Sequence, residues 1–158
     1  MQPMRCPSAL GVASALVLAL GPAACGKAEP RMPAACTTTD RAGYERALGA
    51  APGTVRLPGG VPISDCLRRV RTDAQLQELG TIVHAVAEDL AARAAGGDAV
   101  SARRLGYLTG AVAAGAERSN GISAELARRV AITGSRLGDT PALARALAEG
   151  ADAGQARG

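Results

Sequence analysis

His84 is the only histidine in the sequence, and its ordinary pKa lies near neutral pH, so it is the first candidate for acid–base chemistry. Glu88 follows four residues later, a spacing that places both side chains on one face of a helix. A histidine held by a carboxylate can act as a general base toward a hydroxyl nucleophile, and such a pair would define a hydrolase. No serine or cysteine stands nearby in the sequence, so a histidine on the flank of a helix is the simpler interpretation.

The adjacent carboxylates Glu88 and Asp89 must point in different directions on a helix. They do not form the facing pair that glycoside hydrolysis needs, and we expect them to be solvated surface charges. The sequence also contains no phosphate-binding loop, nucleophile elbow, haem-attachment motif or zinc-ligand spacing. We therefore expect no cofactor and no metal, and the pattern favours a function other than catalysis.

Glycines at four-residue spacing raise the possibility of a ligand cleft. Gly106 and Gly110 flank Tyr107 in a segment that is otherwise rich in alanine. Small residues at this spacing let a second helix approach closely, and close packing is the simpler explanation. The alternative is an Ala/Gly-lined cleft between helices, with Tyr107 at its edge. The uncharged run over residues 105–116 is too short to span a membrane.

Arginine pairs recur along the chain, and a face that gathered them could bind anionic lipid headgroups or an anionic wall polymer. The pairs are Arg68 with Arg69, Arg103 with Arg104, and Arg128 with Arg129. The net charge is only +4 and both signs are interspersed, so ordinary solvated residues are the simpler interpretation. With two tyrosines and no other aromatic residue, the chain has little to stack on bases, and we expect no nucleic acid partner.

The first part of the chain has the organisation of an export signal. Arg5 precedes an uncharged run over residues 10–20, and Gly21-Pro22 then leads into small residues. This order of charged, apolar and small-residue regions is typical of a secretory signal peptide. The apolar run is short for a membrane span. We therefore expect residues 1–24 to be removed on export.

The segment Ala23-Ala24-Cys25-Gly26 resembles the lipobox of bacterial lipoproteins, with Pro22 where that family usually has Leu, Val or Ile. The resemblance implies cleavage after Ala24 and a lipid with acyl chains such as palmitate on Cys25. It covers only this segment and implies nothing about activity. The alternatives are ordinary cleavage nearby, for example after Gly26, which would release a secreted or periplasmic protein, and an uncleaved anchor.

The two cysteines that follow the signal, Cys36 and Cys66, are predicted to form a disulfide. Of the four cysteines in the sequence, Cys6 leaves with the signal and Cys25 is the lipid site. In an oxidising, exported setting the remaining two most simply pair. A metal site is the alternative, but it lacks ligands because the chain has one histidine.

Apolar residues at three- and four-residue spacing predict an all-α fold, a small bundle of three to four main helices. Thr72 and Gln75 have the spacing of a capping box, and Asp98, Ser123 and Thr140 are further predicted caps. The last helix is predicted to fray after Gly150. The inward positions of the successive helices are Leu76, Leu79, Val83, Val86 and Leu90; Leu105, Leu108, Val112 and Ala116; Ile122, Leu126, Val130, Thr133 and Leu137; and Leu143 and Leu147.

The chain after the signal is expected to fold as one domain behind a short tether. Residues 25–35 form the lipid-anchored tether, and residues 36–71 hold a short helix and a Pro/Gly-rich loop closed by the disulfide. Ser64 is expected to cap a short helical turn in that segment. Residues 72–158 form the helical bundle of the same domain.

These features favour a lipoprotein of the bacterial cell envelope, on the outer side of the cytoplasmic membrane, that binds or scaffolds another envelope component. Its expected partners are the membrane, through the lipid, and an envelope protein or anionic polymer. One alternative is a secreted, soluble helical protein that binds a small ligand in the Ala/Gly-lined cleft. A less favoured alternative is a hydrolase that uses His84.

Overall fold

A computed structural model describes residues 31–119, 121–137 and 140–158, so the export signal and Cys25 lie outside the described residues. The described part of the chain is helical and contains no strand, which confirms the predicted all-α class. It holds seven α-helices, more than the three to four main helices predicted, because three short helices precede the long ones. The four longer helices are α4 (Asp73–Ala95), α5 (Ala99–Ala116), α6 (Ala124–Ser135) and α7 (Pro141–Arg157). The short elements are α1 (Ala35–Thr38), α2 (Arg41–Leu48), the 3-10 turn η1 (Pro58–Gly60) and α3 (Ile63–Arg68).

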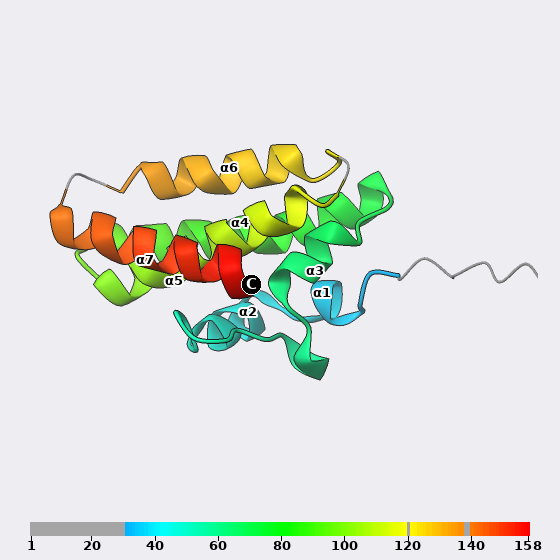
Figure 1. Ribbon diagram of the computed structural model, residues 1–158, viewed down its shortest axis with the longest axis horizontal. Helices are drawn as coiled ribbons and strands as arrows, with labels where there is room; N and C mark the ends of the chain where they lie inside the picture. The colour runs from blue at the N-terminus through cyan, green and yellow to red at the C-terminus, as the bar shows by residue number, and fades with distance from the viewer. Residues whose placement is uncertain (1–30, 120, 138–139) are drawn as a thin grey trace, which may run out of the picture.

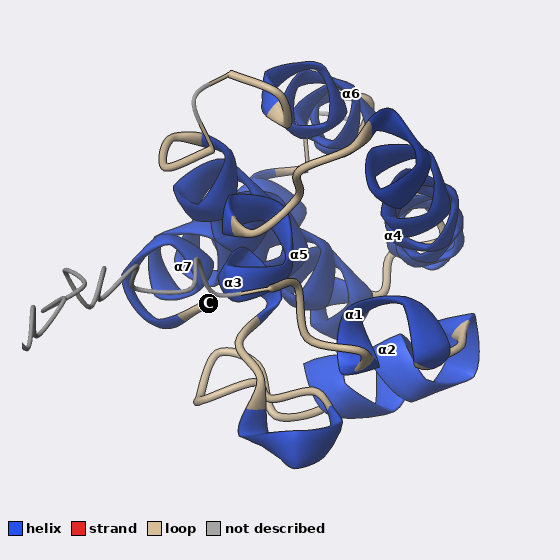
Figure 2. Cartoon of the chain, turned by 90° about the vertical axis from the view of Figure 1, so that its right-hand side faces the viewer, coloured by secondary structure: helices blue, strands red, loops and turns tan. Residues whose placement is uncertain are grey.

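Helix α5 lies at the centre of the molecule. The four longer helices run roughly along the long axis of the molecule (Figure 1). In the view along that axis, the other helices surround α5 (Figure 2). Helix α5 contacts α2, α3, α4, α6 and α7, and most of its residues are buried. A helix surrounded in this way must be apolar on most faces, and the alanines and glycines of α5 meet that requirement. Among the described helices, none combines the length and the apolar character of a membrane-spanning segment.

The predicted disulfide between Cys36 and Cys66 is confirmed, and it joins α1 to α3 with the two Cα atoms 5.5 Å apart. Both cysteines are fully buried. The Tyr44 hydroxyl of α2 donates a hydrogen bond of 2.8 Å to the Cys36 carbonyl, and burial raises the pKa of Tyr44 above its usual range. The disulfide and this hydrogen bond hold the short helices together, and the same hydrophobic core contains residues from α2, α3, α4 and α5.

The helix ends agree in part with the predicted caps. Asp98 accepts the Val100 amide at 2.9 Å, as expected of an N-cap. Thr72 accepts the Gln75 amide at 3.2 Å, which is half of a capping box. The other half differs, because the Gln75 side chain accepts the amide of Arg71 at 2.9 Å, one residue before the cap. The bond still satisfies a backbone donor at the start of α4.

Two serines that were expected to cap helices connect distant segments instead. The Ser123 hydroxyl donates to the Leu67 carbonyl of α3 at 3.1 Å, although Ser123 does stand at the N-cap position of α6. Ser64 lies within α3, and its hydroxyl donates to the carbonyl oxygen of Gly158. The prediction that the last helix frays after Gly150 is also wrong. Helix α7 continues to Arg157 because the residues after Gly150 pack against α5, and the Gly158 carbonyl that follows the helix accepts from Ser64 of α3.

Candidate functional site

The face of α5 that carries Gly106 and Gly110 is covered by α7. A Cβ atom added to Gly106 would lie 2.0 Å from the Leu147 carbonyl oxygen, and one added to Gly110 would lie 2.1 Å from the Ala151 carbonyl oxygen. Backbone therefore meets backbone along this face, and both glycines are buried. Helix α7 occupies the position of the predicted Ala/Gly-lined cleft, and the two glycines allow the helices to pack closely.

The facing surface of helix α7 also carries two glycines, Gly150 and Gly154. A Cβ atom on Gly150 would lie 2.0 Å from the Arg103 carbonyl oxygen, and one on Gly154 would lie 2.1 Å from the Tyr107 carbonyl oxygen. The sequence predicts no packing role for Gly150 and Gly154, because the last helix is expected to fray after Gly150. The four-residue spacing of this pair nevertheless repeats the spacing of Gly106 and Gly110, and that match is the signal from which the helix pair could be found.

Tyr107 does not face open space in this structure. Its side chain is fully buried, and its hydroxyl oxygen accepts a hydrogen bond of 3.3 Å from the amide of Val55, which is also fully buried. A loop amide in a buried position needs such a partner. Tyr107 therefore joins the loop before α3 to the central helix.

We expect Tyr107→Phe to lower the free energy of unfolding by about 1–2 kcal/mol, because the Val55 amide would stay buried without an acceptor. Chemical denaturation followed by circular dichroism would measure the loss. Amide hydrogen exchange at Val55 should become faster in the variant. An unchanged denaturation midpoint together with unchanged exchange would contradict this role of the hydroxyl.

Each of the arginine pairs at α3 and α6 shares a single carboxylate. Asp65 accepts from Arg68 at 2.6 Å and from Arg69 at 2.9 Å. Glu125 accepts from Arg128 and from Arg129, each at 2.8 Å. These two hydrogen bonds lower the pKa of Glu125 to about 2. Each of these arginine pairs is thus held by one carboxylate of its own helix.

The pair on α5 differs from the other two. Arg103 forms an ion pair of 3.0 Å with Glu149 of α7, and the buried Nε atom of Arg104 has no hydrogen-bond partner within the described ranges. The three pairs lie on three different helices, and five of the six arginines meet a carboxylate. A basic face made of all three pairs has little support in this geometry.

His84 lines a groove of about 620 Å³ between α4 and α6. Apolar residues including Leu76 and Leu126 line the groove, and the His84 side chain is 52% exposed. The imidazole Nε2 lies 3.9 Å from the Glu88 carboxylate, which is too far for a hydrogen bond. The Thr133 hydroxyl of α6 donates to the same carboxylate at 2.9 Å.

The order of these three groups is not that of a nucleophilic triad. In a triad the imidazole accepts the proton of the hydroxyl, and the carboxylate orients the imidazole. Here the carboxylate of Glu88 stands between the hydroxyl of Thr133 and the imidazole of His84. Thr133 is also only 3% exposed, so a substrate has little access to its hydroxyl. This arrangement gives the hydrolase hypothesis no support.

Glu88 and Asp89 point to different helices, as their adjacency requires. Glu88 meets α6, and Asp89 forms an ion pair of 3.0 Å with Arg41 of α2. Within the described ranges, no three side chains of His, Cys, Asp or Glu gather where they could hold a metal ion. The carboxylates of α4 thus connect helices.

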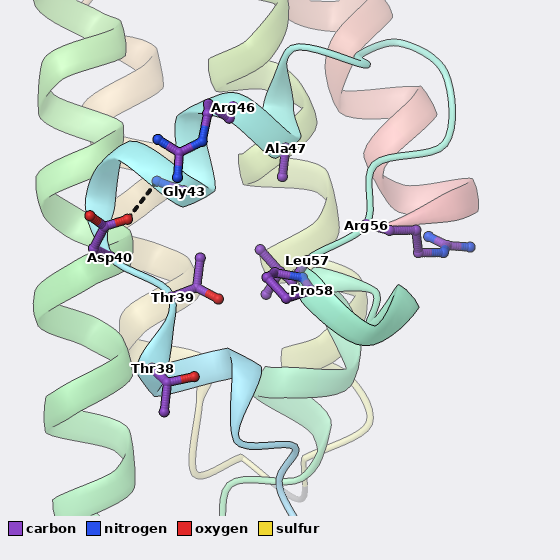
Figure 3. A pocket seen from close by; sticks show the side chains of 9 residues that line it. All are labelled: Thr38, Thr39, Asp40, Gly43, Arg46, Ala47, Arg56, Leu57 and Pro58. Carbon is purple, nitrogen blue, oxygen red and sulfur yellow. Dashed lines mark hydrogen bonds between the residues drawn. The ribbon is translucent and has the colours of Figure 1, made fainter.

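A second hollow, of about 580 Å³, opens between the α1–α2 segment and the loop before η1 (Figure 3). It is more polar than the groove at His84 and holds hydroxyl, carboxylate and guanidinium groups. No motif in the sequence points to it, because two segments of the chain form it together. The lining residues are Thr38, Thr39, Asp40, Gly43, Arg46, Ala47, Arg56, Leu57 and Pro58.

The chain matches no protein-family model, no curated protein and no solved structure.

Proposed function

We propose that this chain is an exported, lipid-anchored binding protein of the bacterial cell envelope that performs no catalysis. The observation that carries the proposal is the Cys36–Cys66 disulfide. Disulfides persist in oxidising compartments outside the cytoplasm and are rare inside it. Both cysteines are fully buried, which suits a structural bond and not a redox-active one.

The sequence before the helical domain supports both export and a lipid anchor on Cys25. A charged, apolar and small-residue order over residues 1–24 accounts for export, and Cys25 follows in a motif similar to a lipobox. Several acyl chains on one cysteine would hold the protein stably at the outer side of the cytoplasmic membrane. The tether over residues 25–35 then leads directly to the disulfide-bonded segment.

Binding has more support than catalysis. The imidazole, carboxylate and hydroxyl near His84 stand in the wrong order for activating a nucleophile. The two hollows offer contact surface for an envelope protein or a small ligand. An anionic wall polymer has less support as the partner, because five of the six paired arginines already meet carboxylates.

Intact mass of the protein made in a bacterial host tests the proposal. We expect a chain that starts at Cys25 and carries the mass of acyl chains, and we expect Cys25→Ala to lose both the acyl mass and the membrane fraction. Cys6→Ala is the matched control, because Cys6 leaves with the signal, so the mature mass should not change. Reduction should add the mass of two hydrogens.

Two results would overturn the proposal in separate ways. A mature chain without acyl mass would mean a released protein and would remove the anchor. A full-length chain with both Cys36 and Cys66 as free thiols would mean that the protein stays in a reducing compartment, and export itself would be wrong.

A further inference from the structure

We draw no further inference here: the strongest candidate, the apolar groove between α4 and α6 that His84 lines, carries none because nothing in the structure shows what covers it.

Discussion

Gly106→Ala and Gly150→Ala are each expected to lower the free energy of unfolding by about 3 kcal/mol. Alanine is the better helix former by about 1 kcal/mol, so propensity alone predicts the opposite sign. The steric cost outweighs this gain in helix propensity, because a Cβ atom at either position would lie 2.0 Å from a carbonyl oxygen of the facing helix. A backbone atom cannot move aside as a flexible side chain can, so α5 and α7 must separate. Urea denaturation followed by circular dichroism would measure the loss.

Gly80→Ala is the matched control, since it makes the same substitution inside a helix where there is space. A Cβ atom at Gly80 would meet the methyl groups of Leu126 at 3.7 Å and 3.8 Å, which is ordinary van der Waals contact. We therefore expect this variant to gain up to about 1 kcal/mol. If all three variants shifted the denaturation midpoint in the same direction, close approach of the helix backbones would not explain the glycines.

Loss of the Cys36–Cys66 disulfide is expected to cost roughly 3–4 kcal/mol, estimated from the chain entropy of the loop that it closes. The bond spans 30 residues and joins α1, a helix of only 4 residues, to α3. So short a helix is marginal without outside support. The cost should therefore appear first as loss of order in the segment that precedes α4.

Thermal unfolding of the wild-type protein and the Cys36→Ala/Cys66→Ala double variant, each with and without reductant, would measure this effect. Reductant should lower the midpoint of the wild type to near that of the double variant and should leave the double variant unchanged. If the wild type kept its midpoint after mass analysis had shown full reduction, the disulfide would contribute little to stability.

Much of the fold could be predicted because its signals are local. The apolar spacing of Leu79, Val83, Val86 and Leu90 defines the buried face of α4, and all four are fully buried. The disulfide followed from the assignment of the other cysteines to the signal and its cleavage site. Asp98 was predictable as a cap because its partner, the amide of Val100, is two residues away.

The remaining features depend on contacts between residues that are far apart in sequence. Ser123 stands at a helix start, but its hydroxyl donates to Leu67, which is 56 residues away. The prediction that the last helix frays after Gly150 is wrong for the same reason, since contact with α5 stabilises the end of α7. The second hollow, which is shown in Figure 3, is lined by Asp40 and Arg46 at the two ends of α2 and by Leu57 of a separate loop. No local pattern in the sequence indicates that these residues lie close together.

The central position of α5 has a consequence for the order of events during synthesis. Helix α5 leaves the ribosome before α6 and α7, and its glycine face has no neighbour until residues 141–157 have been made. Because the chain is made from its N-terminus, the contact between α5 and α7 can form only after the last helix has been made. A protein that is threaded through a membrane channel must stay unfolded during passage. On the export route that we propose for this chain, late formation of the α5–α7 contact would leave α5 without its partner helix during that step.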